Sequence, residues 1–156
     1  MKTTDSLFFV FAGGGSGGHL QPGLAIVAEL QRRLPGSQFL FLCSGRPIDQ
    51  QILSAAAAAD PRIRWNVVAG SRSSSGLYRF MEPLRLSIEC FRAVRLLRQQ
   101  RPTVVIGLGA RASLAGCLAA RILAVPVLLL ELNCIPGTAT RLLSRFAKLC
   151  LTGLPL

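Results

Sequence analysis

Residues 7–19 read LFFVFAGGGSGGH, and they decide the fold class of this 156-residue chain. The apolar run Leu7–Ala12 shows no alternation of polar and apolar side chains, which is typical of a central strand buried on both faces. A glycine-rich loop follows it directly, and Pro22 then stands where a helix would begin. A buried strand, a glycine loop and a helix in this order predict the first unit of a Rossmann-like α/β domain.

The same alternation continues to the end of the chain, without an internal repeat or a linker. Further strands are expected at residues 39–43, 63–69, 104–106, 127–130 and 149–152, and helices from Pro22 to about Arg33 and at 48–59, 79–101, 112–123 and 138–148. Buried strands that alternate with helices pair in parallel through right-handed crossovers. The sequence therefore predicts one doubly wound domain over residues 1–156.

Three unusual segments come at the carboxyl ends of expected strands. They are the first glycine loop at 13–19, a second glycine turn at 107–113 and the segment 131–133. Open parallel sheets bind their ligands at this edge. We therefore expect the three segments to form a single site.

The first loop is suited to a diphosphate, because glycines let the backbone approach a ligand and a helix N-terminus adds unpaired N–H groups and partial positive charge. Gly13, Gly15 and Gly18 also match the spacing of the dinucleotide fingerprint, which is a weak signal in so glycine-rich a loop. That interpretation needs an acid after the second strand, where this chain has Arg46, a residue suited to a 2′-phosphate. An NADP-binding Rossmann module thus stays open as an alternative.

His19, the single histidine, follows the last glycine of this loop. A neutral imidazole at the start of a helix can accept a proton from an attacking hydroxyl. The alternative is that it caps the helix or bonds the loop, and the residues alone do not separate the two.

The charge balance is strongly basic, with 18 Lys and Arg against 7 Asp and Glu and a net charge of +11. A phosphorylated substrate, an anionic membrane surface and nucleic acid are the partners that such a charge favours. The expected helix 79–101 carries six arginines, and its apolar spacing predicts a buried stripe of Phe80, Leu84, Ile88, Phe91, Val94 and Leu97. The alternatives for this helix are an ordinary packed surface helix and one that lies on a lipid surface. No nucleic-acid motif is present, so nucleic acid is not expected.

The five cysteines form no CxxC pair, so neither a disulfide frame nor a metal site is expected.

The longest apolar stretch, Leu114–Leu130, contains Arg121 and Pro126, which predicts a core helix and strand instead of a membrane span. We expect a cytoplasmic location, with peripheral contact at the inner face of the plasma membrane.

Residues 14–25, GGSGGHLQPGLA, resemble the first glycine loop of the MurG-type glycosyltransferases, which reads close to GGTGGHxxPGLA. Gly107 and Gly109 stand where that family has its second glycine loop. Leu130–Asn133 stands where it reads His-Glu-Gln-Asn, and residues 136–143 resemble its next helix. The likeness thus spans nearly the whole chain.

The resemblance implies the N-terminal, acceptor-binding half of a two-domain GT-B enzyme that moves N-acetylglucosamine from UDP-GlcNAc to a polyprenyl-diphosphate-linked muramyl sugar, converting lipid I to lipid II. It implies no metal and no cofactor. It assigns catalytic roles to His19 and Glu131. It assigns binding of the acceptor and its diphosphate to Gly14, Gly15, Gly17, Gly18, Gly107, Gly109 and Asn133, and we add Ser16 and Arg111 of the same two loops as candidates.

The chain departs from the family pattern in its later segments. Ala110-Arg111 replaces Gly-Tyr in the second loop, so Arg111 is expected either to bind phosphate or to face water. Leu130 and Leu132 replace His and Gln in the third. Glu131 is expected to orient a sugar hydroxyl or His19, or else to pair with an arginine. The family's C-terminal nucleotide-sugar domain is not expected within these 156 residues, so UDP-GlcNAc is expected to bind a further domain or a partner subunit. A non-catalytic membrane-recruiting subunit of a split transferase is a further alternative.

Overall fold

The structure, a computed structural model, describes residues 7–15, 17–70 and 81–153. The strands are β1 (Phe8–Ala12), β2 (Gln38–Ser44), β3 (Ile63–Ala69), β4 (Val104–Gly107), β5 (Val127–Glu131) and β6 (Leu149–Thr152). The helices are α1 (Leu20–Arg33), α2 (Pro47–Ala59), α3 (Glu82–Gln100), α4 (Ala110–Ile122) and α5 (Thr138–Leu143). All strands pair in parallel in the order β3-β2-β1-β4-β5-β6. This is the doubly wound Rossmann-like sheet that the sequence predicts.

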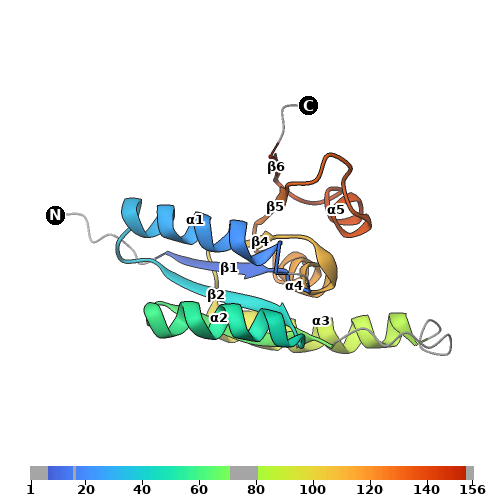
Figure 1. Cartoon of the computed structure of the whole chain (residues 1–156). Helices are drawn as coiled ribbons and strands as arrows, with labels where there is room; N and C mark the ends of the chain where they lie inside the picture. The colour runs from blue at the N-terminus through green and yellow to red at the C-terminus, as the bar shows by residue number, and fades with distance from the viewer. Residues whose placement is uncertain (1–6, 16, 71–80, 154–156) are drawn as a thin grey trace.

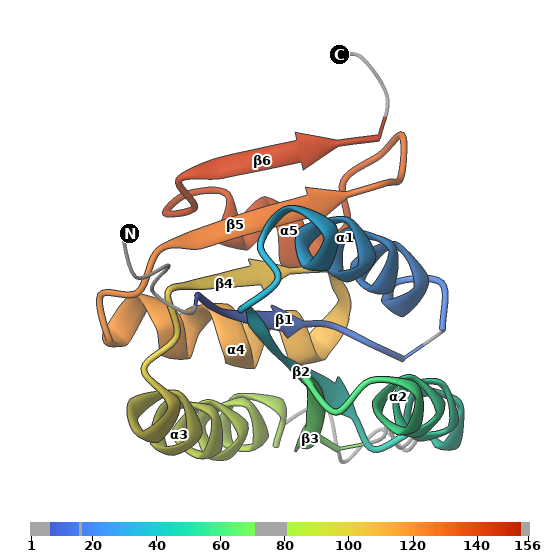
Figure 2. The same cartoon turned by 90° about the vertical axis from the view of Figure 1, so that its left-hand side faces the viewer.

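Two helical layers cover the sheet, one on each face (Figures 1 and 2). Helices α1 and α2 lie on one face, and α3, α4 and α5 lie on the other. The alternating side chains of β1 divide between two cores: Phe9 and Phe11 pack under α1 and α2, whereas Val10 and Ala12 face α3 and α4. On the first face Phe11 stacks on Phe41 of β2 with ring centroids 5.0 Å apart. The apolar run of β1 is therefore buried on both sides, as expected of a central strand.

Helix α3 turns a different face to the core from the one predicted. Its fully buried apolar residues are Ala93 and Leu97, whereas Leu84, Ile88 and Phe91 are exposed, Phe91 to 69%. The small Ala93 lets α3 pack closely against α4, and the larger apolar side chains are left on the outside. The predicted buried stripe is wrong for these three residues, and Phe80 lies outside the described residues.

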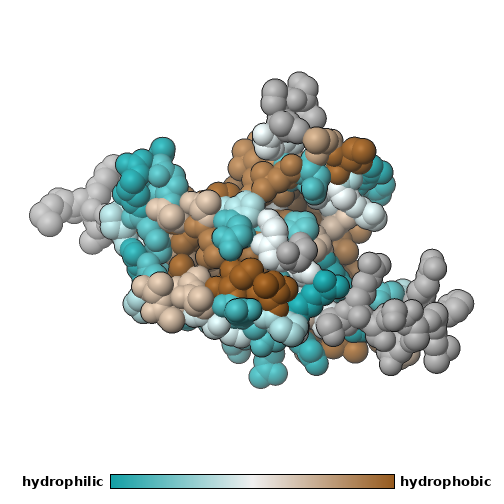
Figure 3. Space-filling model, in the orientation of Figure 1, coloured by the Kyte–Doolittle hydropathy of each residue, from teal (hydrophilic) through white to brown (hydrophobic). Residues whose placement is uncertain are grey.

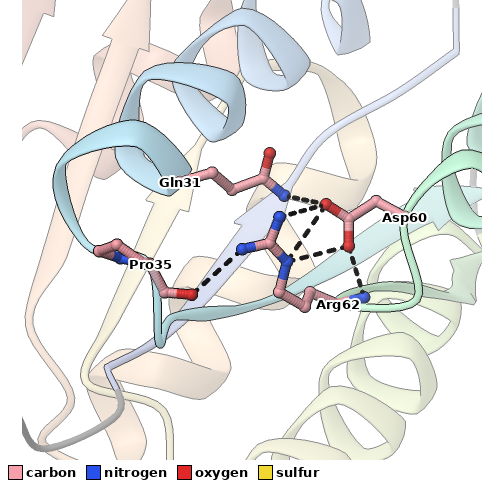
Figure 4. A network of polar contacts seen from close by, with 4 residues as sticks. All are labelled: Gln31, Pro35, Asp60 and Arg62. Carbon is pink, nitrogen blue, oxygen red and sulfur yellow. Dashed lines mark hydrogen bonds and ion pairs between the residues drawn. The ribbon is translucent and has the colours of Figure 1, made fainter.

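A polar network fixes the turn that leads from α2 into the amino-terminal end of β3 (Figure 4). Asp60 accepts hydrogen bonds from the Arg62 guanidinium at 2.7 Å and from Gln31 of α1 at 2.6 Å. Arg62 also donates to the carbonyl of Pro35. The Arg62 hydrogen bonds lower the pKa of Asp60. The network ties the end of α1 to the start of β3, far from the expected site.

The two edges of the sheet differ in character. Exposed apolar side chains gather at the β6 end, over β5, β6 and α5 in the upper part of Figure 3. They include Leu132, Ile135, Leu142, Leu149 and Leu151, and all four residues of β6 are exposed. The exposed residues of β3, at the other edge, are Arg64, Asn66 and Val67. Helix α5 ends at Leu143, five residues earlier than predicted, before the chain enters β6.

Candidate functional site

The strand order reverses between β1 and β4, and a cavity of about 570 Å³ lies beyond the carboxyl ends of the strands there. This is where open α/β sheets bind ligands. Its walls come from the first loop (Gly14, Gly15, His19), the second loop (Gly109, Ala110, Arg111, with Leu114), the turn after β2 (Ser44, Arg46), the segment after β5 (Glu131, Asn133), residues 137–140, and Gly70 and Glu82. The predicted convergence of the three segments on one site is confirmed.

The two glycine loops fit against each other without room for side chains. A Cβ on Gly13 would lie 2.6 Å from the Cβ of Leu108, so the backbones approach too closely for any other residue. Gly109 has a φ of +92° and packs on the imidazole of His19, where a Cβ would come within 3.1 Å of Cδ2. Glycine is needed at Gly109 for both reasons, because L side chains rarely adopt that φ.

A buried acid behind the first loop is the main feature that the sequence did not reveal. Asp49, in the first turn of α2, is fully buried and accepts the Gly15 N–H through both carboxylate oxygens, at 2.9 and 2.7 Å. It also accepts a short hydrogen bond from the Ser44 hydroxyl. Gly14, with a φ of +144°, has no space for a Cβ beside this carboxylate. Asp49 therefore holds the loop in its conformation from behind.

His19 lies on the cavity wall, at the N-cap position of α1. Its side chain forms no capping hydrogen bond with the helix, so the helix-capping alternative is wrong, whereas bonding to the loop stays open. The ring is half-buried against Gly109 of the second loop. This position leaves the imidazole on the wall of the cavity, where a ligand hydroxyl would have to come within hydrogen-bond reach for His19 to act as a general base.

Arg111 lines the cavity and its side chain is mostly buried, so the expectation that it faces water is wrong. Its Nε donates to Glu89 at 3.1 Å and its Nη1 forms a short contact with Glu82, both on α3. Its Nη2 is buried and has no hydrogen-bond partner in the described part of the chain. Burial would lower the pKa of Arg111, but the hydrogen bonds to Glu82 and Glu89 raise it. Because Glu89 also accepts the Gly70 N–H, this cluster joins α3, α4 and the end of β3.

The carboxylate of Glu131 points into the loop that follows β5. It is 5% exposed and accepts hydrogen bonds from the N–H groups of Asn133 and Gly137 and from the Asn133 side-chain amide. Burial would raise the pKa of Glu131, but the hydrogen bonds from Thr140, Asn133 and Gly137 lower it. Among the described residues no arginine forms an ion pair with it. The carboxylate organises the loop that presents Asn133 to the cavity.

Three further glycines that were predicted to bind the acceptor do not line the cavity. Gly107, the last residue of β4, is buried against Ser113, Cys117 and Leu129 and does not line the cavity. Gly17, with a φ of +69°, and Gly18 shape the turn into α1 without lining the cavity. Ser16 lies outside the described residues.

Comparison with known proteins shows the family. The sequence profile of the glycosyltransferase family 28 N-terminal domain matches residues 9–152. Two relatives are named UDP-N-acetylglucosamine–N-acetylmuramyl-(pentapeptide) pyrophosphoryl-undecaprenol N-acetylglucosamine transferase. The protein from Methylococcus capsulatus is 34% identical over 94% of this chain and 40% of its own length. The one from Pelobacter propionicus is 40% identical over 88% of this chain and 36% of its own length.

The fold comparison agrees with the sequence comparison. The crystal structure of Acinetobacter baumannii MurG superposes with a TM-score of 0.79 at 27% identity, over 96% of this chain and 42% of that one. This chain spans about 40% of the length of the relatives named above. With the profile covering both glycine loops and all six strands, the chain belongs to glycosyltransferase family 28, and its residues correspond to the N-terminal domain of that family.

Proposed function

We propose that this chain is the acceptor-binding domain of a hexosyltransferase and binds a polyprenyl-diphosphate-linked muramyl sugar. The complete enzyme would transfer N-acetylglucosamine from UDP-GlcNAc to the C4 hydroxyl of that sugar, forming lipid II from lipid I. The observation that carries the proposal is the cavity at the β1/β4 switch, with the two glycine loops and His19 on its wall. The names of the relatives at 34% and 40% identity support the same substrates.

The chemistry assigned to His19 is proton transfer. Glycosyl transfer to a hydroxyl requires a base that takes the hydroxyl proton as the oxygen attacks the sugar carbon. His19 is the only histidine of the chain and sits where both glycine loops meet. The acceptor diphosphate would lie against the loops, and its sugar hydroxyl would point to the imidazole.

UDP-GlcNAc would bind a donor domain, carried on the same polypeptide or on a partner subunit. The relatives are about two and a half times as long as the part they share with this chain, which leaves room in them for such a domain. The described residues that line the cavity would then form one side of the catalytic cleft.

The outer face of α3 supports docking on an anionic membrane at the cytoplasmic side. Met81, Leu84, Ile88 and Phe91 recur at three- and four-residue spacing and are all exposed, by 46 to 69%. Arginines flank this stripe along α3 at 85, 92, 95 and 98. Apolar side chains that enter the lipid boundary, with arginines for anionic headgroups, are typical of interfacial helices. No described helix has the length and hydropathy needed to cross a bilayer.

The stripe starts beside the cavity, because Glu82 in the first turn of α3 lines it. A protein docked through this face would therefore hold the cavity close to the headgroup region. That is where a diphosphate attached to a membrane-embedded polyprenyl chain is found.

The proposal is tested by titrating this chain with a soluble, short-chain analogue of lipid I and, separately, with NADP⁺, using calorimetry. We expect saturable binding of the acceptor analogue and no comparable binding of NADP⁺. Tight NADP⁺ binding without acceptor binding would favour the dinucleotide module. In a complete enzyme that contains this chain, His19→Ala should lower kcat by about 10²- to 10⁴-fold, the usual contribution of a general base, without loss of folding. Unchanged turnover would remove His19 from the mechanism.

A further inference from the structure

Two side chains at the start of α2 bind both backbone polar groups of Gly15 in the first glycine loop. Asp49 accepts the N–H of Gly15, and the Nη1 of Arg46 donates to the carbonyl of Gly15 at 2.6 Å. Since the Gly15 N–H is already bonded to a carboxylate, it is not available to a ligand. Part of the backbone cradle that glycine loops offer to phosphates is therefore used internally in this protein.

The hydrogen bond to Gly15 places the positively charged Arg46 guanidinium at the cavity. Arg46 is exposed and lines the cavity beside Gly14 and Gly15. A guanidinium has five N–H donors in a planar arrangement, and the bond to Gly15 uses only one of its nitrogens. The others can form the paired hydrogen bonds that an arginine makes with phosphate oxygens.

Arg46 differs from the other arginine on the cavity wall in how its charge is balanced. Arg46 and Arg111 are the arginines that line the cavity in the described part of the chain. Arg111 is neutralised by Glu82 and Glu89, while Glu131 adds a further negative charge. Arg46 forms no ion pair with any described carboxylate. Of the two described arginines on the cavity wall, it is thus the one without an ion pair to a described carboxylate.

We propose that Arg46 is the residue that contacts the diphosphate in the cavity, positioned through Gly15 by Asp49. This inference rests on the proposed function, because it takes the ligand to be a diphosphate. It assigns to Arg46 the role that the sequence suggested for Arg111. The diphosphate could belong to the lipid-linked acceptor or to UDP-GlcNAc, and the test separates these sources.

The test compares binding of two probes by the intact chain and its variants, using calorimetry at fixed ionic strength. The probes are a short-chain polyprenyl-diphosphate muramyl analogue and UDP. Arg46→Gln removes the charge but keeps a side-chain N–H donor for Gly15, and Arg46→Lys keeps the charge without the planar fork. Arg121→Ala is the control, because Arg121 is an exposed arginine in the last turn of α4, at the opposite end of that helix from the cavity-lining Ala110 and Arg111.

Arg46→Gln should weaken binding of the acceptor analogue by about 10- to 100-fold, the size of a charge-assisted hydrogen-bond pair, and Arg46→Lys should lose less. Arg121→Ala should bind as the unmodified chain does. A loss confined to UDP would assign Arg46 to the donor diphosphate. If the unmodified chain binds the acceptor analogue and Arg46→Gln weakens binding of neither probe, the role of Arg46 is refuted while the proposed function stands. If the unmodified chain does not bind the acceptor analogue, the proposed function itself fails.

Discussion

Replacing Asp49 by Asn tests whether the buried carboxylate holds the first glycine loop in place. The side chain is fully buried, and both of its oxygens accept the Gly15 N–H while one also accepts the Ser44 hydroxyl. The amide keeps the shape but turns one acceptor into a donor and removes the charge. Hydrogen bonds to a charged group contribute roughly 1.5–3 kcal/mol, so we expect a loss of about 2–3 kcal/mol. For a chain of this size that lowers Tm by roughly 4–12 °C.

The assay combines thermal unfolding with the NMR signal of the Gly15 amide proton. An N–H bonded to a carboxylate resonates downfield, so Asp49→Asn should move this signal upfield while the fold is kept. Glu29→Gln makes the same charge change on the exposed side of α1 and should alter the free energy of unfolding by no more than about 0.5 kcal/mol. An unchanged Gly15 signal together with an unchanged Tm in Asp49→Asn would refute the reasoning.

Three further changes test other parts of the structure. Arg111→Met should lower the free energy of unfolding by about 2–4 kcal/mol in urea titrations, because it leaves a buried glutamate on α3 without its cation. Glu131 has a lowered pKa in the folded chain, so its carboxylate stabilises the fold above about pH 4.3, its unfolded value, and this contribution is lost as the pH falls through the folded value. Glu131→Gln should flatten the pH dependence of stability below about pH 4.3. The double variant Leu84→Gln/Phe91→Gln should abolish sedimentation with anionic vesicles, whereas Ile122→Gln, an equally exposed apolar residue on α4, should not; equal sedimentation of both would contradict docking through α3.

The fold followed from local patterns that operate within a few residues. Continuous apolar runs marked the buried strands, and the strands β3 and β6 were predicted with the boundaries that the structure has. The glycine loops could be placed because the carboxyl ends of parallel strands share one edge. These regularities depend on neighbouring residues, so a single sequence suffices to recognise them.

The contacts that shape the site join residues far apart in the sequence, and they could not be predicted from local patterns. Asp49 reaches Gly15 across 34 positions, and Arg111 reaches Glu82 across 29. In the sequence Asp49 was one acid in the first turn of a helix, with no sign that it would be buried. The orientation of α3 was predicted wrongly because Glu89 is buried by its pairing with Arg111, which hydrophobic periodicity does not register.

The most direct test of the account is an amide chemical-shift titration of this chain with a short-chain lipid I analogue. The account predicts that the largest changes occur at Gly14, Gly109 and Asn133, together with a shift of the His19 ring signals, and that they saturate with one affinity. No saturable change at these residues, or changes confined to another surface such as the exposed edge of β3, would contradict the claim that the cavity between the two glycine loops binds the acceptor.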